Sequence, residues 1–454
     1  MKRAYYFIGI GGIGMSAIAR YLMHEGCAVG GYDRTESALC DELAAEGADI
    51  HYEDSVDLIG PQFRDPASTS VIYTPAVPAD HSELCWFREN GFSVVKRSRA
   101  LGILSEGKYV MAVAGTHGKT TTSTLVAWLN RCVTGGGSAF LGGISKNFHN
   151  NLVLGSGDRL AVEADEFDRS FLQLFPHIAV ITSTDADHLD IYSDHGHVLE
   201  AFGLFAGQVD ADGFVVLKQG VELPQEGIRA KVLRYAYDTP CDFYASDIVA
   251  LPGGRFDFTL NHPDGRIEHC CVGIPGWVNV ENAVAAAAAA LLHGIAPEQI
   301  RAALACFQGV RRRFDIHLDT PRIAYIDDYA HHPNEIRAAI SSIRNIFPGR
   351  KLLGIFQPHL YTRTRDFAAD FADALGGLDA LVLLPIYPAR EEPIPGVSAS
   401  LIFDQVRIDD KTLIPKEQLM DFLHTRTLDC VVTFGAGDID RFIGPVETYL
   451  KTLL

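Results

Sequence analysis

Residues 109–129, YVMAVAGTHGKTTTSTLVAWL, decide the fold of the middle of the chain. The stretch begins with an apolar run, Val110–Ala114, of the length that a buried parallel strand needs. A six-residue turn at 115–120 follows, and Thr121–Leu129 then carries apolar residues at the spacing of a helix's buried face. The order of strand, glycine-rich turn and helix predicts an α/β domain with a ligand site at the turn.

The turn has the composition of a phosphate-binding loop. Its glycines let backbone N–H groups approach phosphate oxygens, and the helix N-terminus adds partial positive charge. The Lys119 amine is placed to reach the outer phosphates, and the Thr120 hydroxyl to bind Mg²⁺. Val113 replaces the first glycine of the usual G-x-x-x-x-G-K-[ST] pattern, so the loop is a shortened relative, and a plain structural turn stays the alternative. The residues predicted to bind phosphate here are Gly115, Thr116, His117, Gly118, Lys119, Thr120 and Thr121.

Composition narrows the class of protein. The chain has 454 residues, 47% hydrophobic and 21% charged, which is typical of a globular protein of roughly two to four domains. A net charge of −18 argues against a protein whose main partner is nucleic acid. No apolar run reaches the length of a membrane span, and early glycines favour a first strand over a signal peptide. Nine scattered cysteines without a C-x-x-C pair fit reduced thiols, so we expect a cytoplasmic protein.

A second glycine-rich turn lies near the N-terminus. Ala4–Ile10 predicts a strand, residues 9–14 (GIGGIG) fit G-x-G-x-x-G, and Met15–Glu25 predicts a helix. Asp33 follows the loop by about 20 residues, as the dinucleotide fingerprint requires. Three interpretations stay open: an NAD site, a site for the diphosphate of another nucleotide, or close packing of helix on strand. Further βα units predict an open sheet with Asp33 and Thr74 at the carboxyl ends of its strands.

The two glycine loops imply two phosphorylated ligands, which weakens a simple dehydrogenase interpretation. Downstream of the central loop, a predicted strand runs into EADEFD at 163–168. Mg²⁺ prefers oxygen ligands, and Glu163 is placed to be one, although a solvated acidic turn is the alternative. The strand Ile178–Thr182 leads into a polar loop that contains His188, for which a structural role and a metal or phosphate role both stay open.

The region after residue 213 contains weaker signals. Residues 213–273 hold four short alternating runs, which we expect to be antiparallel strands at the edge of the central sheet. Asn279 and Asn282 precede an alanine-rich helix, Ala283–Leu292, and amides at a helix start predict capping. Asn279 has adenine binding as its alternative. The arginines of 311–313 form either a solvated face or part of a phosphate site.

The last part of the chain repeats the α/β pattern. Predicted strands at 323–326, 352–356, 380–384 and 431–434 each end in a polar loop. We therefore expect three α/β domains: an N-terminal Rossmann-like sheet at 1–106, a central P-loop ATPase-type domain at 107–313, and a C-terminal Rossmann-like domain at 314–454.

Seven motifs along the whole chain together resemble the Mur ligases of peptidoglycan synthesis. They are GTHGKTTT (115–122), EADE (163–166), DADHLD (185–190), NVEN (279–282), RRRF (311–314), DDYAHHP (327–333) and FQPHLYTRTRDF (356–367). GIGGIGMS (9–16) and PIYPAREEPIPG (385–396) resemble the branch that joins L-alanine to UDP-N-acetylmuramate. The nearest rival is the branch that attaches a recycled tripeptide to the same nucleotide sugar.

The resemblance implies a ligase that uses ATP, Mg²⁺, UDP-N-acetylmuramate and L-alanine, has no nucleic-acid or membrane partner, and is a monomer or weak homodimer. It implies catalytic roles for Lys119, His188, Arg313 and His331. It implies that Thr120, Glu163 and His188 bind the metal ion, and that further ATP contacts come from Asn279, Arg313 and Asp328. The implied substrate-binding residues are Gly9, Gly11, Gly12, Gly14, Asp33, Thr74, Tyr329, His331, His359 and Arg363. The chain departs from the family at Val278, where histidine is common.

The chemistry of such a ligase requires a base for the attacking amine, and the sequence does not separate His188, His331 and His332. Two other classes of protein stay open at this point. A dehydrogenase would use the first glycine loop but leave the central loop unexplained. An ATP-regulated protein that binds a nucleotide sugar would use both loops without turnover.

Overall fold

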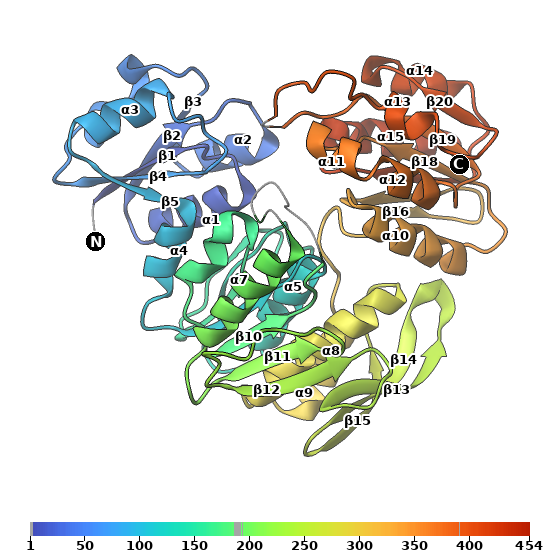
Figure 1. Ribbon diagram of the computed structural model, residues 1–454, viewed down its shortest axis with the longest axis horizontal. Coiled ribbons are helices and arrows are strands. Elements are labelled where there is room, and N and C mark those ends of the chain that lie inside the picture. Colours follow the sequence, from blue (N-terminus) through green and yellow to red (C-terminus); the bar gives the residue numbers. More distant parts are fainter. Residues whose placement is uncertain (1–2, 186–191, 193, 390) are drawn as a thin grey trace. The chain divides into compact units, whose positions relative to one another are not determined.

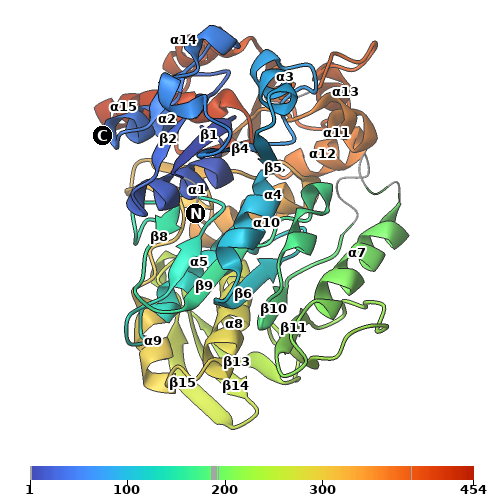
Figure 2. The same cartoon turned by 90° about the vertical axis from the view of Figure 1, so that its left-hand side faces the viewer.

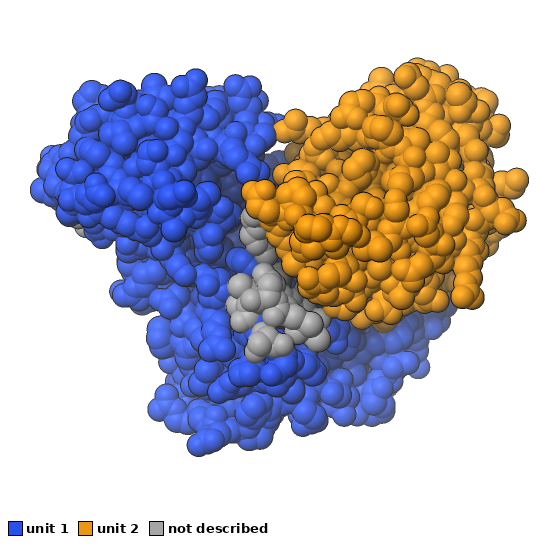
Figure 3. All heavy atoms as spheres, turned by 45° about the horizontal axis from the view of Figure 1, so that its top comes forward, with its two compact units in different colours: residues 1–249, 257–274, 279–308 blue, residues 250–256, 275–278, 309–454 orange. Residues whose placement is uncertain are grey.

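The computed structural model describes residues 3–185, 192, 194–389 and 391–454. The chain divides into two compact units, shown in different colours in Figure 3: residues 1–249, 257–274 and 279–308 form the first, and residues 250–256, 275–278 and 309–454 form the second. Among the described residues, no helix has the length and apolarity that crossing a membrane requires.

The N-terminal sheet is parallel throughout, with the strand order β3-β2-β1-β4-β5 (Figure 1). Helix α1 buries Ala17, Ile18 and Leu22 against this sheet, as the spacing of those residues predicts. Helix α4 was not expected from the sequence. The elements are β1 (Ala4–Ile8), α1 (Ile13–His24), β2 (Ala28–Tyr32), α2 (Ala38–Ala45), β3 (Asp49–His51), β4 (Thr69–Tyr73), α3 (Ser82–Glu89), β5 (Ser93–Lys96) and α4 (Arg97–Ser105).

The central sheet has ten strands in the order β15-β14-β13-β12-β11-β10-β6-β9-β7-β8. Strand β6 pairs in parallel with β9 on one side and β10 on the other, and Figure 2 shows these strands in succession. The carboxyl ends of all three strands therefore share one edge, as expected for the phosphate loop and the two polar segments. The first elements are β6 (Tyr109–Ala114), α5 (Lys119–Asn130), β7 (Ser138–Phe140), β8 (Leu152–Val153), β9 (Arg159–Glu163), the 3-10 helix η3 (Phe167–Gln173), β10 (Ile178–Ile181) and α7 (His195–Gly207).

The expectation for residues 213–273 was partly wrong. Strands β11 and β12 continue the parallel arrangement of β10, and β13 pairs in parallel with β12. Strands β14 and β15 form an antiparallel hairpin, as expected. Alternation of apolar residues predicts a strand but not its direction, and the connection between β11 and β12 is long enough for a parallel crossover. The remaining elements are β11 (Phe214–Lys218), β12 (Lys231–Ala236), β13 (Phe243–Ala250), β14 (Phe256–His262), β15 (Gly265–Cys271), α8 (Trp277–Leu292) and α9 (Pro297–Ala305).

The third sheet lies in the second unit and has the order β16-β17-β21-β18-β19-β20. It is parallel except for the edge strand β16. With this sheet, the predicted fold class of three α/β sheets is confirmed. Its elements are β16 (Asp315–Asp319), β17 (Ala324–Asp328), α10 (Pro333–Ile346), β18 (Leu352–Phe356), α11 (Tyr361–Asp366), α12 (Ala368–Leu375), β19 (Ala380–Leu383), α13 (Ser400–Phe403), β20 (Lys411–Leu413), α14 (Leu419–His424), β21 (Cys430–Phe434) and α15 (Ile443–Thr452).

Candidate active site

The central glycine loop leaves β6 through a turn that only glycine fits. Gly115 has a φ of +135°, and a Cβ there would lie 2.1 Å from Thr182 Oγ1. Behind the turn, the Ser183 hydroxyl accepts the His117 N–H (2.8 Å) and bonds the Thr116 hydroxyl (2.8 Å). Ser183, in the segment after β10, therefore holds the glycine loop in place through two hydrogen bonds. The sequence did not reveal this role. The loop ends at Gly118, and α5 begins at Lys119.

Lys119 is held over the loop by a buried carboxylate. Its Nζ donates to the Gly115 carbonyl (2.6 Å) and to Glu166 Oε1 (2.8 Å), and Glu166 is only 1% exposed. Burial alone would lower the pKa of Lys119, but the carboxylates of Glu166, Asp165 and Glu163 outweigh it, so this pKa lies above its ordinary value. Lys119 is therefore a fixed positive charge at the mouth of the loop.

Glu163 and Thr120 lie on facing elements at the same edge. Glu163 ends β9, and its Oε2 accepts from the Ser123 hydroxyl at 3.5 Å. Ser123 is three residues beyond Thr120 in α5, so the two side chains share one helix face. A Cβ on Gly142 would lie 2.2 Å from Glu163 Oε2, so this glycine provides the space that the carboxylate occupies. One carboxylate and one hydroxyl suit Mg²⁺, which takes few protein ligands and only oxygen.

The other predicted metal ligand, His188, lies outside the described residues. Among the residues that the structure describes, no group of three or more His, Cys, Asp or Glu side chains is arranged to hold a metal ion. The fit of Mg²⁺ therefore depends on Thr120 and Glu163 together with oxygens that a phosphate ligand would supply.

The capping prediction for Asn282 was wrong. Helix α8 begins at Trp277, whereas the predicted helix began at Ala283. Asn282 therefore lies within the helix, five residues after its first residue, and cannot be its N-cap. Instead, Asn282 Oδ1 accepts from the Thr122 hydroxyl of α5 (3.2 Å), and its Nδ2 donates to Asn279 Oδ1 (3.2 Å). The same Oδ1 would lie 3.0 Å from a Cβ on Gly118. Asn282 therefore packs against the end of the phosphate loop, and it positions Asn279.

The N-terminal glycine loop has a different set of neighbours. Gly9 has a φ of +88°, and a Cβ there would lie 2.5 Å from the Thr74 methyl group. Asp33 Oδ2 accepts the Gly11 N–H at 2.8 Å, and Oδ1 accepts the Thr35 N–H at 3.1 Å. The structure therefore brings Asp33 and Thr74 to the loop, as predicted, but Asp33 also ties down a backbone N–H of the loop itself.

Arg97 connects this loop to the central domain, and the sequence did not identify it. A Cβ on Gly14 would lie 2.8 Å from Arg97 Nη1, so the guanidinium lies directly against the start of α1. Its Nη2 pairs with Asp165 Oδ2 at 3.2 Å. A second pair joins Lys96 Nζ to Asp168 Oδ2 at 2.8 Å. The acidic segment after β9 thus contacts Lys119 through Glu166 and the N-terminal domain through its two aspartates.

The second unit brings together a separate group of predicted residues around Tyr329. The Arg313 guanidinium lies 4.7 Å from the centre of the Tyr329 ring. Asp328 ends β17, and burial raises the pKa of Asp328 to about 7, although Arg313 acts in the opposite direction. Arg312 has a structural role instead, because it donates to buried Asp327 (3.1 Å) and to the Gly435 carbonyl (2.7 Å).

His331 and His359 belong to the same group. Their rings lie 5.8 Å apart, and the His331 ring packs edge-on against Tyr329 at 5.2 Å. His359 stacks on Tyr387 at 5.9 Å. Arg363 lies in α11 and is buried, with 7% of its surface exposed. Three of the residues predicted from the resemblance, Tyr329, His331 and His359, are therefore on loops that follow the carboxyl ends of the parallel strands β17 and β18.

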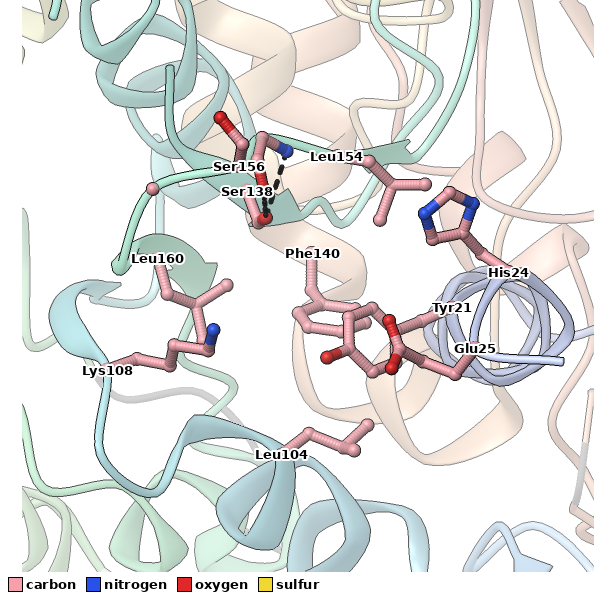
Figure 4. Close-up of a pocket in the computed structure, with 12 residues that line it drawn as sticks. Tyr21, His24, Glu25, Leu104, Lys108, Ser138, Phe140, Leu154, Ser156 and Leu160 are labelled. Atoms are coloured by element: carbon pink, nitrogen blue, oxygen red, sulfur yellow. Dashed lines mark hydrogen bonds between the residues drawn. The ribbon is translucent and has the colours of Figure 1, made fainter. Parts of the chain in front are cut away.

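A cavity of about 130 Å³ lies elsewhere, between α1, α4 and the strands β7 and β9 (Figure 4). Tyr21 and His24 of α1 and Glu25, which follows it, line one side, and Phe140 lies on β7. None of its twelve lining residues is among those predicted for binding or catalysis. The cavity is therefore not the predicted site.

Comparisons with known proteins agree with this arrangement. Three family descriptions match in order: "Mur ligase family, catalytic domain" at residues 4–109, "Mur ligase middle domain" at 113–290, and "Mur ligase, glutamate ligase domain" at 312–437. A UDP-N-acetylmuramate–L-alanine ligase of Parabacteroides distasonis is 51% identical over 452 residues, which cover 98% of this chain and 97% of that protein.

Solved structures give the same picture. A UDP-N-acetylmuramate–alanine ligase of Thermotoga maritima superposes with a TM-score of 0.83 at 28% identity, covering 98% of this chain and 99% of that one. A murein peptide ligase of Psychrobacter arcticus shares the fold, with a TM-score of 0.74 at 21% identity over 99% of this chain and 98% of its own. The chain belongs to the Mur ligase family.

Proposed function

We propose that the protein catalyses the ATP-dependent ligation of L-alanine to the lactyl carboxylate of UDP-N-acetylmuramate, with release of ADP and phosphate. The observation that carries the proposal is full-length similarity, at 51% identity, to a ligase of that name. The two glycine loops support it, since the reaction needs one site for a nucleotide sugar and another for ATP.

The reaction requires ATP because a carboxylate oxygen is too poor a leaving group for direct attack by an amine. The lactyl carboxylate attacks the γ-phosphorus of ATP, and ADP leaves to give an acyl phosphate. The alanine amine then attacks the acyl carbon, and phosphate departs from the tetrahedral intermediate. Phosphoryl transfer depends chiefly on positioning and on neutralising charge. Lys119 supplies a fixed positive charge to the central loop, and we assign Arg313 the same task.

We assign Mg²⁺ to Thr120 and Glu163, with His188 as a third ligand. When bound, Mg²⁺ neutralises phosphate charge and orients the phosphate oxygens. The chain's own residues supply the rest of the ATP site: the backbone of Gly115–Thr121 surrounds the phosphates, while Asn279 and Asp328 bind the remainder of the nucleotide.

We assign the diphosphate of UDP-N-acetylmuramate to the loop at Gly9, Gly11, Gly12 and Gly14. Asp33 and Thr74 border this loop and bind the adjoining part of the nucleotide. The amino acid is assigned to Tyr329, His331, His359 and Arg363. We further propose that the enzyme acts in the cytoplasm as a monomer or weak homodimer, on small molecules alone.

The alternative substrate is a recycled peptide, because a murein peptide ligase shares the fold. The 21% identity to that structure supports the fold alone, whereas the 51% relative is an L-alanine ligase. A dehydrogenase would leave the central loop and its Lys119–Glu166 pair unexplained, and a non-catalytic binding protein would use both loops but show no turnover.

The acyl phosphate gives a direct test of the reaction. With oxygen-18 in the lactyl carboxylate, we expect one labelled oxygen in the released phosphate and the ligated product in equal amount, both measured by mass spectrometry. Unlabelled phosphate would contradict activation of the carboxylate by ATP.

A further inference from the structure

The second unit distinguishes between two of the candidate bases. His332 is the N-cap of α10, where its Nδ1 lies 3.4 Å from the Asn334 N–H, and its ring packs edge-on against Phe367 at 5.1 Å. It is only 6% exposed. The His332 ring caps the N-terminus of α10 and packs in the core. It is therefore a poor candidate for contact with the amine of a substrate that enters from solvent. His188 lies outside the described residues.

His331 is more accessible, and one of its ring nitrogens is fixed. Its side chain is 19% exposed. Nδ1 lies 2.9 Å from the Tyr329 carbonyl oxygen and 3.4 Å from Glu335 Oε2. A carbonyl and a carboxylate only accept hydrogen bonds, so Nδ1 carries the proton of the neutral imidazole. The nitrogen that gains and loses a proton is therefore Nε2.

Glu335 is itself held in place. Its Oε2 accepts the backbone N–H of His331 at 3.0 Å and that of His332 at 3.2 Å. Glu335 is the third residue of α10 and forms a capping box with the N-cap His332. Within the described part of the chain, the rings of Tyr329, just after β17, and His359, after β18, pack against His331. Arg313 lies over Tyr329, Tyr387 stacks on His359, and Asp328 at the end of β17 interacts electrostatically with Glu335. A carboxylate fixed beside Nδ1 orients an imidazole and stabilises its protonated form, as in hydrolases that pair histidine with aspartate.

We infer that Glu335 is a positioning residue that makes His331 the base of the ligation step. His331 Nε2 takes one proton from the ammonium group of the amino acid, and the freed lone pair forms the C–N bond at the acyl carbon. Phosphate leaves with the electrons of the broken C–O bond and carries away the second proton that the nitrogen loses as the amide forms. This inference rests on the proposed function. It assigns Glu335 a role beyond capping α10.

The test is Glu335→Gln, because glutamine also completes a capping box but carries no charge. We expect an unchanged melting temperature, a KM for L-alanine within about two-fold of wild type, and a kcat lowered by about 10- to 100-fold. The pH at which kcat falls to half its maximum on the acid side should move lower, because the imidazolium loses its anionic neighbour. Glu335→Ala, which also removes the cap, should add a loss of thermal stability.

Hydroxylamine provides a second measurement, since it is largely uncharged at neutral pH and needs no base. It should trap the acyl phosphate at nearly equal rates in wild type and Glu335→Gln, whereas only wild type uses L-alanine well. A Glu335→Gln enzyme with wild-type kcat and pH profile would overturn the inference, and so would equal losses with both amines. Failure of wild type to form product from L-alanine would instead overturn the proposed function.

Discussion

The two glycine loops of this chain have the same backbone design but different charged neighbours. Each leaves a central parallel strand through a glycine with positive φ, Gly9 or Gly115, and leads into a buried helix. At the central loop the cation belongs to the loop, where Lys119 pairs with Glu166 at 2.8 Å. At the N-terminal loop the cation, Arg97, comes from another helix, and the carboxylate of Asp33 binds the loop backbone.

This difference indicates which ligand each loop suits. A loop with its own lysine and a neighbouring carboxylate for Mg²⁺ suits the concentrated charge of a triphosphate. A loop bordered by an aspartate that accepts hydrogen bonds suits a nucleotide sugar, which carries hydroxyl groups beside a less charged diphosphate. Backbone geometry therefore predicts phosphate binding at both loops, while the side chains around them separate the two ligands.

The largest expected effect is the loss of Lys119. Replacement by methionine leaves Glu166 buried without its cation, which costs about 3–5 kcal/mol of folding free energy. The double variant Lys119→Met with Glu166→Gln avoids this penalty and isolates catalysis. We expect phosphate release to fall about 1,000-fold in the double variant, because a fixed charge at the transferred phosphate is lost.

Binding at the other loop is the control for that variant. The dissociation constant for UDP-N-acetylmuramate, measured by calorimetry without ATP, should stay within about two-fold of wild type. Near-normal phosphate release would show that the central loop does not bind ATP, and loss of sugar-nucleotide binding would show that the two loops are not separate sites.

Substitution of glycines in the N-terminal loop should have a smaller effect on activity. The sequence motif does not distinguish Gly9 from Gly12, but the structure does. Gly9→Ala forces a side chain into a positive φ and against Thr74, whereas a Cβ on Gly12 would meet its nearest neighbour at 3.5 Å. Backbone strain of about 1–3 kcal/mol predicts a KM for UDP-N-acetylmuramate raised about 10- to 100-fold in Gly9→Ala. Gly12→Ala should change it little, and the KM for ATP should stay constant in both. Equal effects of the two substitutions would contradict the geometry.

The comparison extends to the buried carboxylates of the two sheets. Glu166 pairs with a lysine, whereas fully buried Glu83 accepts from the Tyr6 hydroxyl at 2.8 Å and lies 3.2 Å from His51 Nε2. Burial raises the pKa of Glu83 to about 7. A raised carboxyl pKa stabilises the fold at low pH, and this contribution is lost as the pH rises through about 7.

We therefore expect wild type to lose about 3 kcal/mol relative to Glu83→Gln between pH 4.5 and pH 8. Chemical denaturation of both proteins across this range measures the difference. A constant difference between the two proteins would show that Glu83 keeps the same charge throughout.

The smallest effect is expected at the ion pair between Arg97 and Asp165. The two side chains are 19% and 36% exposed, and water screens such pairs. A double-mutant cycle with Arg97→Met and Asp165→Asn should therefore give a coupling free energy of about 0.2–1 kcal/mol in thermal stability. A coupling of several kcal/mol would instead make this pair the main connection between the two domains.

Much of this arrangement could be predicted from the sequence. Apolar runs that end in polar loops identified most strands of the three sheets, although β3, β7, β8, β13, β16 and β20 were missed. The rule that ligands gather at the carboxyl ends of parallel strands placed Glu163 beside the central loop. The direction of β11 and β12 was missed because alternation does not encode strand direction. The start of α8 was missed because its first helical residues, Trp277–Asn279, directly follow Gly276 and have the local sequence of a loop.

The contacts that tune the site could not be predicted from the sequence. Glu166 was one of four carboxylates in a short run, and only the fold shows that it is the one that meets Lys119. Arg97 and Ser183 lie far along the chain from the loops they contact, and neither belongs to a recognisable pattern. Pairings of this kind depend on tertiary packing, which local spacing does not encode.

The central claim is that the two loops serve a nucleotide sugar and ATP in the ligation of L-alanine. The most direct measurement is phosphate release with UDP-N-acetylmuramate and Mg-ATP in the presence of L-alanine, glycine, L-serine or the recycled tripeptide, each alone. We predict that phosphate release depends on the sugar nucleotide and that kcat/KM is highest for L-alanine. Preference for the tripeptide, or no release with any amine, would contradict the account.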